Sequence, residues 1–136
     1  MKNYKETLTI DGEHFNNLDG FYDEIAKVFT DGSYPIGHSL DAFIDLLIGG
    51  NGVYNVGDNV LVRWKNSSKS RKDLGYNATV KYYEDKIKLC HSSNTKNFQK
   101  KLDDAKLNTG DTIFDIICKI FKEPDIYEHS CSLELK

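Results

Sequence analysis

The chain has 136 residues, a length that suits one domain with a real hydrophobic core. Apolar residues make up 39% and charged residues 29%, which excludes a largely disordered chain. The net charge of −3 conceals an asymmetry, because residues 1–60 hold 3 basic and 10 acidic side chains whereas residues 61–136 hold 15 and 11. We expect the acidic half to attract a basic partner surface, unless its charges only solvate an ordinary face.

The cysteines and the apolar runs bear on the compartment. Cys90, Cys118 and Cys131 are odd in number and form no CxxC pair, so a disulfide framework is not expected. Residues 1–6 are polar and no apolar stretch follows them, so no signal peptide is predicted. No apolar run approaches the roughly 20 residues that cross a bilayer. We therefore expect a reduced, cytoplasmic protein without a membrane partner.

The first half of the chain predicts two helices between two strands. Residues 7–10 alternate polar and apolar before a turn, and Asn17 can cap a helix over residues 18–29. Ser39 can cap a second helix, which a glycine pair ends. Residues 60–64 are strong β-formers and predict the second strand.

The second half predicts mainly helices. Residues 65–75 are polar and basic, which favours a surface loop or the frayed start of a helix. Apolar residues then recur at helical spacing over residues 76–90, and another helix is expected from Asn94. Asp111 or Thr112 can cap the final helix.

The chain ends with a predicted third strand. Pro124 is expected to end the final helix, and residues 132–135 can form a strand. Parallel strands need crossover connections, and here helices separate every pair of strands. The sequence therefore predicts an α/β fold with a three-stranded parallel sheet, in a single domain spanning residues 1–136.

The most informative motif is an acid pair in the second predicted helix. Asp41 and Asp45 are four residues apart and share one helix face, whereas Leu40 and Phe43 point toward the core. Two like charges at this spacing repel each other, and a cationic partner would relieve the repulsion. The alternative is a solvated face whose first acid only favours the helix N-terminus.

Several stretches resemble the barstar family of ribonuclease inhibitors. Residues 10–15, 18–22 and 34–47 are similar to the amino-terminal half of that family, and residues 60–64 to its second strand, which also ends in Trp. Residues 120–123 resemble its last helix more weakly. The resemblance implies a barstar-like three-stranded parallel sheet packed by helices. Residues 65–110 are then a helical insertion, typical of a longer barstar-related subgroup.

The resemblance also implies a function. The chain would be an inhibitor or immunity protein that blocks the cationic active site of an extracellular-type ribonuclease or nuclease toxin with its acidic helix. It implies no catalytic residue, metal or cofactor, and Asp45 would be the principal anion. The implied partner-binding residues are Tyr34, Gly37, Ser39, Leu40, Asp41, Ala42, Ile44, Asp45 and Glu123.

The chain also departs from the family pattern within this segment. Ser39 stands where the family has Asn, and Ile44 where it has Trp. Pro35 and Ile36 occupy the positions of paired Tyr residues. These changes indicate either a different target enzyme or a lost inhibitory role.

Three other functions are weighed against inhibition. The basic residues of segment 63–76 could bind nucleic acid, although the pI of about 5.8 argues against it. The pair Cys90–His91 with Cys118, Cys131 and His129 has no known zinc-ligand spacing, and buried free cysteines explain it better. An enzyme ranks last, because the acid pair has no matched acid–base partner.

Overall fold

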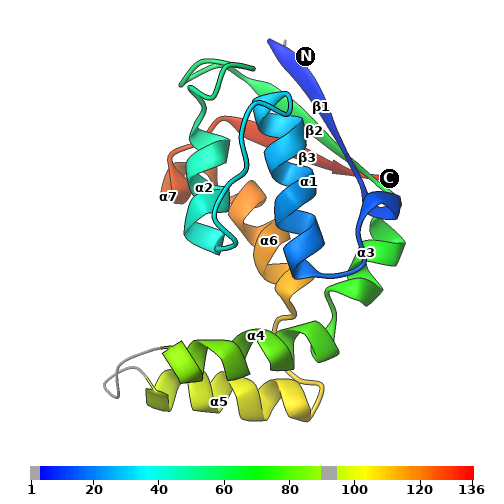
Figure 1. Cartoon of the computed structure of the whole chain (residues 1–136), viewed down its shortest axis with the longest axis vertical. Helices are drawn as coiled ribbons and strands as arrows, with labels where there is room; N and C mark the ends of the chain where they lie inside the picture. Colours follow the sequence, from blue (N-terminus) through cyan, green and yellow to red (C-terminus); the bar gives the residue numbers. More distant parts are fainter. Residues whose placement is uncertain (1–3, 90–94) are drawn as a thin grey trace.

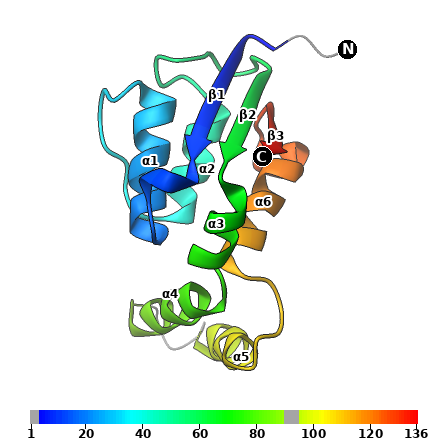
Figure 2. The same ribbon diagram turned by 90° about the vertical axis from the view of Figure 1, so that its right-hand side faces the viewer.

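The computed structural model describes residues 4–89 and 95–136 and contains a three-stranded parallel sheet (Figures 1 and 2). The strands lie in the order β1-β2-β3, and both neighbouring pairs are parallel. Their bounds are β1 (Glu6–Asp11), β2 (Val60–Lys65) and β3 (Cys131–Leu135). The predicted α/β fold with three parallel strands is therefore confirmed.

Helices make up most of the remaining chain and cover one face of the sheet. Their bounds are η1 (Gly12–His14), α1 (Leu18–Thr30), α2 (Leu40–Ile48), α3 (Ser67–Asp73), α4 (Tyr76–Leu89), α5 (Thr95–Lys106), α6 (Ile113–Lys122) and α7 (Pro124–Tyr127). Helices α1, α2 and α6 lie on the same side of the strands (Figures 1 and 2). Along β2, Val62 and Trp64 point toward these helices and are fully buried, whereas Arg63 is exposed on the open face.

The predicted helix caps agree with the structure. The Asn17 side chain accepts a hydrogen bond from the Gly20 amide, and α1 begins at Leu18, directly after Asn17. Of the two predicted caps for α6, Thr112 is the one used, and it forms a capping box with Asp115. Pro124 does not simply end a helix. It begins the short helix α7, because its fixed φ suits a first helical position.

Of the two alternatives predicted for residues 65–75, the surface loop is wrong and a helix is present. Helix α3 lies there, and its Ser70 hydroxyl accepts a hydrogen bond from the indole N–H of Trp64 at 3.0 Å. Both side chains are fully buried. The Trp64 ring stacks on Phe21 of α1, with ring centres 5.4 Å apart, and contacts Phe114 of α6. Helix α3 therefore closes one end of the core.

Helices α4 and α5 form a hairpin outside the sheet and its covering helices (Figures 1 and 2). One hydrogen bond joins α4 to α6, because Thr79 Oγ1 accepts from the Ile113 amide at 2.9 Å. Just before the hairpin, the carbonyl of Leu74, between α3 and α4, accepts from the Phe114 amide at 3.0 Å. The helix predicted over residues 76–90 is observed as α4 up to Leu89. The predicted helix start at Asn94 lies outside the described residues.

Candidate functional site

The segment that carries the acid pair begins with a capped helix. Ser39 has extended backbone angles, and its hydroxyl accepts a hydrogen bond from the Ala42 amide at 3.1 Å. Phe43 and Leu47 of α2 are fully buried, which fixes the rotation of the helix about its own axis. The opposite face is consequently turned to solvent.

Asp41 and Asp45 are exposed on that solvent face. Among residues 4–89 and 95–136, no cationic side chain lies within ion-pair distance of either carboxylate. Burial raises the pKa of Tyr82 on α4 to about 12, and electrostatic interactions with Tyr83 and with the Asp41 carboxylate add to this effect. The acid pair therefore projects a negative potential that the described part of the molecule does not neutralise.

The carboxyl end of α2 is held by side chains from elsewhere in the chain. The Tyr54 hydroxyl lies 3.0 Å from the carbonyl oxygens of both Leu46 and Leu47. The Cys131 thiol of β3 lies 3.5 Å from the Leu47 carbonyl. These contacts satisfy carbonyl groups that have no partner within a helix end. Helix α2 is thus fixed at both ends.

The loop before α2 contains two of the predicted site residues. Gly37 has no left-handed backbone angle, and a Cβ there would meet only the Ala42 Cβ, 3.9 Å away. The fold itself therefore does not require glycine at this position. Tyr34 is 44% exposed, and its hydroxyl donates to the side-chain oxygen of Asn51, beyond the carboxyl end of α2. Tyr34 thus lies at the opposite end of the helix from Ser39.

Seven of the nine predicted site residues form one continuous segment. Leu40, Ala42 and Ile44 are half-buried beside the two exposed acids, and Gly37 and Ser39 directly precede them. Glu123 comes from a different part of the chain. It caps the carboxyl end of α6, where Phe121 contacts Phe43 of α2 with ring centres 5.5 Å apart.

Sequence reasoning gave no role to His38, the residue between Gly37 and Ser39. Its ring nitrogens lie 3.1 Å and 2.8 Å from carboxylate oxygens of Asp19 and Asp23 on α1. Asp19 and Asp23 are four residues apart and therefore share a helix face. A histidine beside a predicted N-cap, preceded by two acids at helical spacing, was the available signal.

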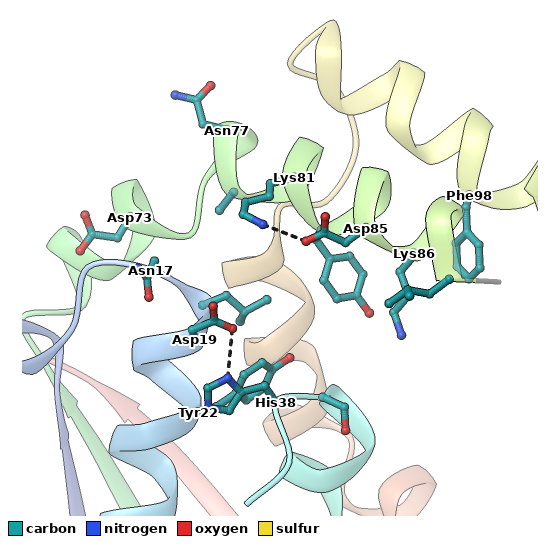
Figure 3. A pocket seen from close by; sticks show the side chains of 15 residues that line it. Asn17, Asp19, Tyr22, His38, Asp73, Asn77, Lys81, Asp85, Lys86 and Phe98 are labelled. Carbon is teal, nitrogen blue, oxygen red and sulfur yellow. Dashed lines mark hydrogen bonds and ion pairs between the residues drawn. The ribbon is translucent and has the colours of Figure 1, made fainter.

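A cleft of about 730 Å³ separates this segment from the hairpin (Figure 3). Asp19 and His38 line one wall, and Lys81 and Tyr82 of α4 line the other, with Phe98 of α5 at one end. Lys81 is paired with its own helix neighbour Asp85 at 2.9 Å. The hairpin therefore forms a second wall close to the amino end of α2.

The basic segment between β2 and α4 is largely occupied by intramolecular contacts. Lys69 Nζ donates to the backbone carbonyls of Gly12 and Phe15 at 3.1 and 2.7 Å. The Arg71 guanidinium lies over the Phe114 ring, 4.7 Å from its centre. Two of the cations suggested for nucleic-acid binding thus serve the fold.

The cysteines of the described residues are structural. Cys118 and Cys131 are free and buried, and burial raises the pKa of each thiol to about 11. His129 Nε2 donates to the Ile120 carbonyl at 2.8 Å, and its Nδ1 accepts from the Cys131 amide. No metal-ligand cluster occurs within residues 4–89 and 95–136. The suggested ligands Cys90 and His91 lie outside the described residues.

A parallel three-stranded sheet covered by helices, with an exposed acid pair on α2, defines a small α/β protein. A family model described as Barstar (barnase inhibitor) matches residues 5–124. The chain therefore belongs to the barstar family. A search of curated proteins found no match to it. In the part of the chain that the structure describes, no helix is long and apolar enough to cross a membrane.

Proposed function

We propose that this chain is a barstar-type inhibitor that blocks the cationic active site of a ribonuclease with helix α2. The observation that carries the proposal is the acid pair of Asp41 and Asp45, exposed and unpaired among the described residues on a helix fixed at both ends. A rigid helix loses little conformational entropy on binding, which favours affinity. Family membership supplies the class of partner.

The remaining site residues would complete the contact surface. Leu40, Ala42 and Ile44 offer half-buried apolar area beside the acids. At Gly37, where the fold leaves room for a side chain, a glycine would let a partner approach the backbone closely. Glu123 would add a further negative charge from the end of α6. The α4–α5 hairpin would lie beside a partner that reaches Asp41 from the cleft.

The proposal is tested by replacing the principal anion. Tagged wild-type protein and Asp45→Ala are used to capture partners from cells of the native source, and the captured fraction is assayed for ribonuclease activity. Glu84→Ala, an exposed acid on α4, is the matched control. Loss of one partner of a buried charge pair costs about 3–5 kcal/mol, so binding should weaken at least about 100-fold.

The dependence on salt provides a second criterion. Electrostatically steered association slows by about 10- to 1,000-fold as ionic strength rises. We expect this slowing for wild type and Glu84→Ala, and a much smaller one for Asp45→Ala. Equal capture of a ribonuclease by all three proteins, or none by wild type, would contradict the proposed function.

A further inference from the structure

The inference concerns His38, which is held between two carboxylates of α1. Nδ1 lies 3.1 Å from Asp19 Oδ1, and Nε2 lies 2.8 Å from Asp23 Oδ1 (Figure 3 draws the Asp19 contact). A neutral imidazole carries one N–H and can donate only one hydrogen bond. Only the imidazolium can donate to both carboxylates at once. The geometry therefore fits the protonated ring.

A ring contact adds to these two hydrogen bonds. The His38 ring stacks on Tyr22, with ring centres 5.5 Å apart and planes inclined by 27°. Tyr22 is buried in α1, so it offers a fixed platform, and an aromatic face favours a cation above it. Asp19 and Asp23 repel each other at four-residue spacing, and a shared cation relieves that repulsion. Three side chains of one helix thus converge on one imidazole.

The position of His38 in the chain links its contacts with α1 to residues 37–45, the segment proposed to bind a partner. Its peptide lies between Gly37, whose carbonyl accepts a hydrogen bond from the Ser39 amide at 3.0 Å, and Ser39, which caps α2. Anchoring the His38 side chain on α1 therefore positions both the loop and the first turn of α2. Ile36 packs on the core two residues earlier and supplies the apolar anchor of the same loop.

Other charged groups face His38 across the cleft. Lys81, Tyr82 and Asp85 of α4 line it, and Lys81 interacts electrostatically with Asp19. Burial raises the pKa of Tyr22, the ring beneath His38, and the charge of Asp41 on α2 adds to this effect. The hydrogen bond that His38 Nε2 donates to the Asp23 carboxylate is the largest effect and raises the pKa of His38 above its usual value, although burial opposes it.

We propose that His38 is a positioning residue whose imidazolium, shared between Asp19 and Asp23, clamps the loop and the amino end of α2 onto α1. When the ring loses its proton, one of the two contacts is lost and the segment is released. The consequence for a partner rests on the proposed function. The clamp itself is a property of the free chain.

The sign of the pH dependence follows from the raised pKa. A group whose pKa is higher in the folded state stabilises the clamped form fully below its unfolded value, which is about 6.5 for His. That stabilisation is lost as pH rises through the folded pKa. Because Asp19 and Asp23 are exposed, the clamp should also weaken at high salt.

The first experiment uses the free full-length chain. Imidazole NMR gives the titration midpoint of His38. Amide hydrogen exchange, measured as a function of pH, gives the protection factors of the Ala42 and Phe43 amides, which donate to Ser39 at the start of α2. We expect protection to fall in step with deprotonation of His38. In His38→Gln this pH step should disappear, and in Asp23→Asn the midpoint should return toward about 6.5. His14→Gln, which removes a histidine of η1, should keep the step.

The second experiment measures binding of purified barnase, the named target of the family, across the same pH range. Wild type should bind more weakly as pH rises through the His38 midpoint, and His38→Gln should lose that step. An unchanged step in protection for His38→Gln on the free chain would overturn the clamp. Absence of barnase binding by wild type at every pH, together with capture of no ribonuclease from cells of the native source, would count against the proposed function instead, so the two failures are distinguishable.

Discussion

Replacing Ser70 with alanine should destabilise the fold through a single hydrogen bond. The Trp64 indole N–H donates to Ser70 Oγ at 3.0 Å, and both residues have 0% exposure. In Ser70→Ala the N–H stays buried without an acceptor, which costs about 1–3 kcal/mol. For a chain of this length about 1 kcal/mol corresponds to about 4 °C in Tm, so Tm should fall by about 4–12 °C.

The assay is urea unfolding followed by intrinsic fluorescence, because the chain contains one tryptophan. Trp64 is itself the donor, so its emission reports directly on the perturbed site. Ser68→Ala, an exposed position on the same helix, is the control and should change the free energy of unfolding by less than about 0.5 kcal/mol. If Ser70→Ala were no less stable than this control, the reasoning that α3 is fixed through the Trp64 bond would be refuted.

Two further predictions concern the basic segment and the thiols. Lys69→Met keeps the aliphatic stem but removes the ammonium from the two carbonyls it serves, so unfolding free energy should fall by about 1–3 kcal/mol, whereas exposed Lys72→Met should change little. If both variants were equally stable and both bound RNA more weakly than wild type in a filter assay, the result would favour nucleic-acid binding instead. Cys118 and Cys131 should resist iodoacetamide at pH 8 until urea is added, because their thiols are buried with a raised pKa; rapid alkylation of either in the native chain, read by peptide mass spectrometry, would contradict this.

The features that the sequence predicted correctly depend on neighbours in the chain. Asn17, Ser39 and Thr112 cap helices because their side chains reach amides three residues later. The parallel sheet followed from helices lying between every pair of strands. The solvent exposure of Asp41 and Asp45 followed from helical spacing. These inferences required no knowledge of distant contacts.

The features that the sequence did not predict depend on distant contacts. Ser70 looks like a surface residue in a polar stretch, and its burial follows only from the position of the Trp64 ring. His38 gains its role from Asp19 and Asp23, which lie 19 and 15 residues earlier. No local pattern states that the loop after α1 folds back along that helix.

The attachment of α2 to β3 has a consequence for the order of folding. The Leu47 carbonyl is contacted by the Cys131 thiol, 84 residues later in the chain, and the same thiol meets the Tyr54 hydroxyl that caps the helix. Contacts between residues so far apart in sequence form late, because a long loop must close first. During synthesis, the acidic helix would therefore emerge well before its carboxyl end can be secured. The carboxyl end of α2 is secured only when the last strand joins the sheet.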